Sequence, residues 1–129
     1  MSQDTNLFVQ AFWVKCREII RPEVDAAVSE LRSSGNDANV STEEYSSVPD
    51  RLPVEVGPSL TLSIRPADAT DGALHPAIQF HGDAAREMVE VRTSAGAKQT
   101  YELAALDARA VRNEIDGWLG KLKTTAPRR

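Results

Sequence analysis

The sequence has one cysteine, Cys16, and only two histidines among its 129 residues. A single cysteine cannot form a disulfide within the chain, so the fold does not depend on a covalent cross-link. A chain of this length can bury a core large enough to be stable without a disulfide or a structural metal. We therefore expect one domain over residues 1–129, in a reducing, cytoplasmic location.

Long apolar runs are also missing. No stretch reaches the roughly 18 apolar residues that a membrane-spanning helix needs. The first sixteen residues have no basic segment ahead of their apolar part, which Gln10 and Lys15 interrupt, so we expect no signal peptide and no membrane partner.

Positive charge is scarce, because the net charge is −4 and the pI is near 5.2. Such a surface repels a phosphate backbone unless its basic residues cluster. They gather only near the end of the chain, where residues 124–129 are expected to be a frayed tail, so no nucleic-acid partner is expected. The residues concerned are Lys121, Lys123, Arg128 and Arg129.

Aromatic residues make up only 5% of the chain, so most of the core must be Leu, Ile, Val and Ala. The sequence also contains no glycine-rich phosphate loop, no nucleophile elbow and no dinucleotide-binding fingerprint. We therefore expect no cofactor, and the sequence favours a protein that is not an enzyme.

The first positive signal is a helix from Asn6 to about Ser34. Its apolar residues recur every three or four positions, which marks one buried face, and Gly35 suits a left-handed helix end. Pro22 lacks an N–H and crowds the preceding turn. We expect a kink at Pro22, near Arg21, or two helices in tandem. The single bent helix is favoured because the apolar phase continues past the proline.

The apolar period then falls to two, as in strands with one buried face. The alternation is weak over 38–43, clear over 60–65, and present over 78–81 and 89–94, with a short fifth piece at 100–103. Residues 94–98 suggest a tight hairpin turn, whereas the connections 46–58 and 66–76 are long and irregular.

A last helix follows Asp107, which is a good N-cap, and carries apolar residues at Val111, Ile115 and Trp118. The sequence thus predicts an α+β fold in the order α-β-β-β-β-(β)-α. We expect an antiparallel meander sheet of four to five strands, with the N-terminal and C-terminal helices packed on one face.

The run His81-Gly82-Asp83 is the most prominent place for chemistry. A catalytic interpretation makes His81 a general base oriented by Asp83. However, Gly and Asp are typical turn residues, and no Ser or Cys nucleophile accompanies the histidine in a motif. We therefore expect Gly82 and Asp83 to form the corner of a hairpin.

Metal binding is the other chemical possibility. His75 and His81, together with Asp71 or Asp83, could ligate zinc. Their spacing matches no known zinc pattern, so we expect no metal, and these four remain low-ranked candidates. Cys16 lies on the apolar stripe of the first helix and is expected to be a small buried hydrophobe.

The start of the first helix is apolar around much of its circumference. Phe8 and Phe12 can face the sheet, which leaves Leu7, Val9 and Trp13 as candidates for a protein interface, most simply in a twofold homodimer. The alternative is that Trp13 packs against the C-terminal helix and its Trp118.

Three functions remain open. The favoured hypothesis is a non-enzymatic protein-interaction module that forms a homodimer. The first alternative is a small-molecule or metal-binding protein, or an enzyme, that uses His75, His81 and loop carboxylates. The second is an acidic adaptor or chaperone for a client protein, because small size, acidity and a helix-plus-sheet layout resemble the acidic secretion chaperones. This analogy rests on size and charge alone, and the middle helix of such proteins is missing here.

Overall fold

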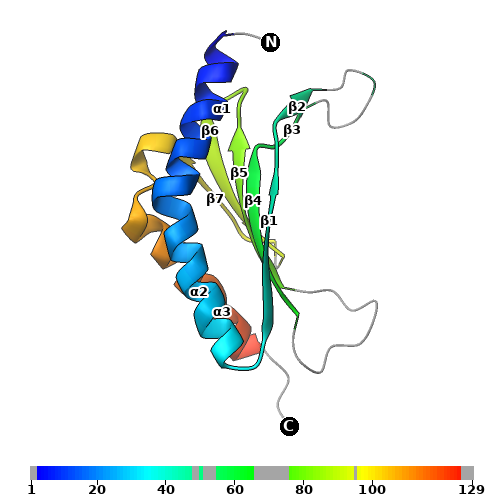
Figure 1. The fold of residues 1–129 in the computed structure, drawn as a ribbon, viewed down its shortest axis with the longest axis vertical. Coiled ribbons are helices and arrows are strands. Elements are labelled where there is room, and N and C mark those ends of the chain that lie inside the picture. The colour runs from blue at the N-terminus through cyan, green and yellow to red at the C-terminus, as the bar shows by residue number, and fades with distance from the viewer. Residues whose placement is uncertain (1–2, 48–49, 51–54, 66–75, 95, 126–129) are drawn as a thin grey trace.

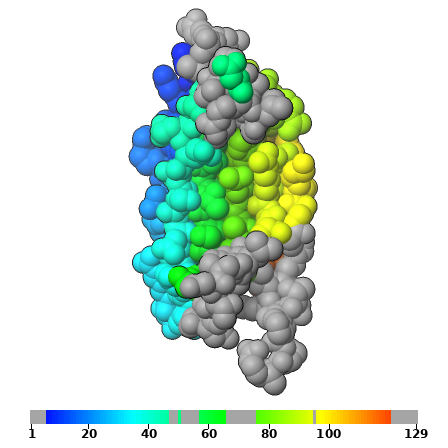
Figure 2. Space-filling model, turned by 90° about the vertical axis from the view of Figure 1, so that its right-hand side faces the viewer, coloured from blue at the N-terminus to red at the C-terminus, as the bar shows by residue number. Residues whose placement is uncertain are grey.

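The computed structural model describes residues 3–47, 50, 55–65, 76–94 and 96–125. Within these ranges, the helices pack on one face of a five-stranded antiparallel sheet (Figure 1), and Figure 2 looks onto the opposite face. The predicted α+β architecture is confirmed. In the described part of the chain, no helix combines the length and the apolar character needed to cross a bilayer.

The N-terminal helix is one continuous helical run in three segments: α1 (Gln3–Lys15), a π-helical turn (Cys16–Ile20) and α2 (Arg21–Ser33). The irregular turn lies just before Pro22, where the Arg21 N–H donates to the Cys16 carbonyl, five residues back. The run curves along the sheet (Figure 1). The predicted single bent helix is therefore present, but the break in the regular hydrogen-bond ladder begins before the proline.

The π turn keeps the buried face of the N-terminal helix directed at the sheet. Buried residues recur every four positions from Phe8 to Val24, and in a regular α-helix this spacing drifts about 40° around the axis per step. A π turn holds more residues than an α turn. It therefore turns the stripe back toward the sheet, where Cys16 and Ile20 are both buried.

The sheet is a meander in the order β1-β4-β5-β6-β7, and all neighbouring strands are antiparallel. Its strands are β1 (Asp37–Glu43), β4 (Ser59–Arg65), β5 (Ala77–Asp83), β6 (Met88–Thr93) and β7 (Lys98–Glu102). A separate two-stranded ladder, β2 (Ser46–Ser47) with β3 (Glu55–Val56), lies within the connection that the sequence leaves irregular. Most of the connection 66–76 lies outside the described residues.

The last helix, α3 (Ala108–Thr125), follows a 3-10 turn at Leu103–Ala105. Asp107 is its N-cap as predicted, because its Oδ1 accepts a hydrogen bond from the Ala110 N–H at 2.9 Å. Since α3 runs to Thr125, the first two residues of the predicted frayed tail are helical, and 126–129 lie outside the described residues.

Both helices contribute to one core against the inner face of the sheet. The core residues are buried, and many of them, such as Phe12 and Phe80, have no exposed surface. Arg112 of α3 also donates two hydrogen bonds to the Glu23 carboxylate of α2, at 3.0 and 3.1 Å. The largest fully buried side chains are Phe12, Phe80, Ile20, Leu60, Leu62, Ile78 and Leu106.

Candidate functional site

The His81-Gly82-Asp83 run lies inside strand β5, so the predicted hairpin corner is wrong. The turn comes later, at residues 84–87. This strand position suits glycine because a Cβ there would stand 3.1 Å from both Phe12 Cδ1 and Pro58 Cγ. The glycine thus allows the N-terminal helix to pack closely against the strand. Close approach of another segment is one of the known reasons for glycine inside a strand.

His81 points to the outer face of the sheet, between Ser59 of β4 and Glu90 of β6. It is half-buried, and this burial, followed by the charge of Arg92, lowers its pKa below 6.5. Asp83 lies two residues along on the same face. Its carboxylate instead receives the Arg86 guanidinium at 2.7 Å and the Arg86 backbone N–H at 3.2 Å.

Glu90 is the centre of the outer-face network. Its side chain is only 9% exposed, and it pairs closely with Arg92, with Arg86 at 3.7 Å and with Lys98 at 3.9 Å. The hydrogen bond from Arg92 lowers the pKa of Glu90 below its usual value. Its position between Val89 and Val91 assigns it to the outer face, but no sequence pattern reveals that three cations cover it.

Two further polar groups on this face, Gln79 and Thr61, extend the network across the strands. Arg92 donates to Gln79 at 3.5 Å, and Gln79 donates to Thr61 at 3.3 Å. Two acidic groups of the face, Asp83 and Glu90, are thus engaged with cations. This arrangement stabilises the sheet and gives no nucleophile that is paired with a base.

The structure describes two of the four candidate metal ligands. His75 and Asp71 lie outside the described residues, whereas His81 and Asp83 share the outer face. Where the structure describes the chain, no group of three His, Cys, Asp or Glu side chains is arranged to hold a metal ion. Cys16 is buried as predicted, and its burial raises the thiol pKa to about 11, although Arg21 opposes this shift.

The candidate interface residues of α1 occupy two sides of the helix. Leu7 is 56% exposed, whereas Val9 and Trp13 are half-buried, and Trp13 packs against the core. Trp13 contacts the ring of Phe12 edge-on at 5.2 Å, so its described aromatic partner is not Trp118. Since Leu7 is 200° and 240° around the axis from Val9 and Trp13, the three cannot form one patch.

A different stripe on α1 is open to solvent. Leu7, Ala11 and Val14 are spaced four and three residues apart, which places them on one face of the helix. All three are exposed, and Val14 is 42% exposed. Leu7 and Val14 are the large hydrophobic side chains that stand out as exposed in the described part of the chain. We call these three residues the α1 stripe.

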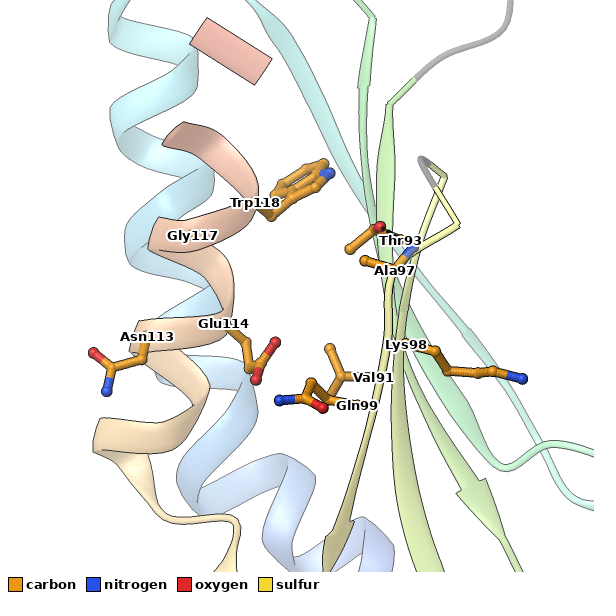
Figure 3. A pocket seen from close by; sticks show the side chains of 9 residues that line it. All are labelled: Val91, Thr93, Ala97, Lys98, Gln99, Asn113, Glu114, Gly117 and Trp118. Atoms are coloured by element: carbon orange, nitrogen blue, oxygen red, sulfur yellow. Dashed lines mark hydrogen bonds between the residues drawn. The ribbon is translucent and has the colours of Figure 1, made fainter. Parts of the chain in front are cut away.

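A cavity of about 300 Å³ lies between α3 and the β6–β7 hairpin (Figure 3). Glu114 projects from α3 into this space and accepts a hydrogen bond from the Tyr101 hydroxyl, while Lys98 points to the other side of the sheet. Burial, followed by the hydrogen bond to Glu114, raises the pKa of Tyr101 to about 12, so the phenol stays protonated. The indole of Trp118 lies across one end, and its buried Nε1 has no hydrogen-bond partner in the described structure.

Sequence reasoning missed this cavity, because its residues come from the β6–β7 hairpin and α3, and no local pattern specifies how these elements pack together. Comparison with protein-family models, with curated proteins and with solved structures gives no match for this chain.

Proposed function

We propose that the protein is a non-enzymatic protein-interaction module, and that the α1 stripe is the surface that binds its client. The observation that carries this proposal is the position of Leu7 and Val14, which are both large, exposed and on the same helical face. Contiguous exposed apolar side chains mark interaction surfaces in soluble proteins.

The geometry of the stripe indicates the chemistry of the client. A different side of α1 packs into the protein's own core through Phe8 and Phe12. Only a narrow row of three apolar side chains is therefore available. Anchors at i, i+4 and i+7 fit an apolar groove between two helices of another protein. The client is thus a protein with such a groove, and the chain acts as its adaptor.

The test is site-specific photo-crosslinking in cells of the natural source, with a benzophenone amino acid in place of Val14. We expect one covalent adduct of reproducible mass, and we expect Leu7→Glu to abolish it. The Leu7→Glu change should alter the free energy of unfolding by no more than about 0.5 kcal/mol, because the side chain is exposed.

The matched control places the same probe at Arg109, an exposed position on α3. The absence of an adduct at position 14, an adduct that Leu7→Glu leaves unchanged, or the same adduct from position 109 would contradict the proposal. An adduct of two 14.1 kDa chains would contradict a separate client and assign the stripe to self-association.

A second candidate function is the binding of a small organic cation in the cavity beside α3. Glu114 is the charged side chain that Figure 3 shows pointing into it, and the Trp118 ring can contribute a cation–π contact.

We expect butylammonium to shift the NMR signals of the Gly117 amide and the Trp118 indole N–H, whereas butanol should not. Glu114→Gln should weaken butylammonium binding about tenfold or more. Equal shifts with both probes, or no effect of the variant, would exclude this function.

A further inference from the structure

Strand β7 forms one edge of the five-stranded sheet, and in the described part of the chain its only strand neighbour is β6. Its five residues, Lys98–Glu102, are all exposed except the half-buried Tyr101. The free side of an edge strand carries backbone N–H and C=O groups that can pair with another strand.

The alternation of hydrogen-bonded pairs along the β6–β7 hairpin determines which backbone N–H and C=O groups of β7 are free. The Thr93 N–H donates to the Ala97 carbonyl at 3.0 Å, so this is a hydrogen-bonded pair. Hydrogen-bonded and non-hydrogen-bonded pairs alternate along an antiparallel ladder. Since Lys98, Thr100 and Glu102 fall on the alternate positions, their N–H and C=O groups point away from β6.

A second hydrogen bond supports the same assignment of hydrogen-bonded pairs. The Ser94 N–H donates to the Ala77 carbonyl at 2.9 Å, across the other side of β6. The even-numbered residues of β6 therefore bond to β5 and the odd-numbered ones to β7. Two observations thus agree that the free groups of β7 belong to Lys98, Thr100 and Glu102.

These groups are self-complementary in one register. If two copies of β7 pair antiparallel about a twofold axis at Thr100, Thr100 meets its own copy and Lys98 meets Glu102 of the second copy. All three residues then fall in hydrogen-bonded pairs, with up to about six new backbone hydrogen bonds. The twofold axis also creates the Lys98–Glu102 pair twice, with opposite charges directly across from each other.

The opposite edge of the sheet lacks this complementarity. In β1 the central residue is Val40, and a twofold pairing about it would set Asp37 against Glu43 of the second copy. Like charges directly opposite each other destabilise a strand pair. The charges that face each other are therefore opposite in the β7 pairing and alike in the β1 pairing, so β7 is the edge that favours its own copy.

We infer that a second copy of this chain binds along β7 in this register, which joins the two five-stranded sheets into one continuous sheet. The resulting homodimer places the partner on a different surface from the α1 stripe, so it does not rest on the client-binding proposal. Gln99 lines the cavity beside α3 and would face the second copy's Tyr101 across the interface.

The test is sedimentation equilibrium of the full chain with a charge-reversal series. We expect the wild type to dimerise and Lys98→Glu and Glu102→Lys each to weaken the dimer about tenfold or more, because each puts two like-charged pairs into the interface. The double variant, which restores opposite charges, should recover most of the affinity. Circular dichroism checks that all variants are folded. Glu102→Lys is the cleaner single change, because Lys98 also pairs with Glu90.

The inference would be overturned if the wild type stays monomeric up to about 1 mM, which is the weak end of protein association. Single and double variants that behave alike would also overturn it. Oxidation of a Thr100→Cys variant gives an independent check, since paired Cα atoms on the axis lie about 5.5 Å apart, within disulfide range. The matched Glu102→Cys variant should not cross-link to itself, because the Cα atoms of the two copies of that residue would lie roughly 14 Å apart. Equal cross-linking by both variants would contradict this register.

Discussion

Replacing Phe12 by alanine is expected to lower the free energy of unfolding by about 3–5 kcal/mol. Phe12 is fully buried, and it lies between α1 and the sheet, where it packs over Gly82 and against the edge of Trp13. Truncation removes the buried ring and leaves a cavity that two rigid elements cannot close. Domains of this size are stable by only about 5–15 kcal/mol, so the loss is a large fraction of the total.

The measurement is urea denaturation, with a lower midpoint and an unchanged slope as the expected result. Leu7→Ala is the matched control on the same helix, because Leu7 is 56% exposed. That variant should shift the free energy of unfolding by no more than about 0.5 kcal/mol. Equal effects of the two substitutions would show that α1 is not seated on the sheet through its Phe12 face.

The second large effect is expected from Gly82→Val, which should destabilise the fold by about 1–3 kcal/mol or more. Valine favours strands over glycine by up to about 1 kcal/mol, so intrinsic propensity alone predicts the opposite sign. Steric contact decides the outcome, because even a Cβ would stand 3.1 Å from Phe12 Cδ1 and Pro58 Cγ and 3.2 Å from Phe8 Cε2. The measurement is again the midpoint of urea denaturation.

Gly117→Ala is the matched glycine control, because nothing lies within 4 Å of a Cβ at that position of α3. This change should stabilise the protein by up to about 1 kcal/mol through helix propensity. A double-mutant cycle then tests the cause: in a Phe8→Ala background, the cost of Gly82→Val should fall because the space is no longer filled. A stabilising Gly82→Val, or a cost independent of Phe8, would contradict the packing role of this glycine.

Much of the fold follows from local pattern. The alternation around Leu60, Leu62 and Ile64 locates β4 to within a residue, and the cap signals at Gly35 and Asp107 mark helix ends that the structure confirms. Gly35 has a positive φ of 89°, as a left-handed helix end requires. The two-residue ladder of β2 and β3 was missed, because strands that short carry no periodic signal.

The candidate site was less predictable. Glycine and aspartate are common turn residues, which is why the sequence predicts a turn at Gly82. In the structure, the inward alternation Ile78, Phe80, Gly82 continues to the buried Ala84. Leu7, Val9 and Trp13 were grouped by hydrophobicity, although the 3.6-residue turn separates Leu7 from the other two. The α1 stripe could have been identified from this angle alone, since Leu7, Ala11 and Val14 share a face.

The sequence by itself determined the order and type of the main elements, because periods of 3.6 and 2 are properties of neighbouring residues. It also determined the charges on β7. Only the tertiary structure decided which backbone groups of β7 are free, that three cations converge on Glu90, and that Glu114 and Trp118 line a shared cavity. These features depend on how the strands pair and how α3 packs against the sheet, and no local pattern specifies such contacts.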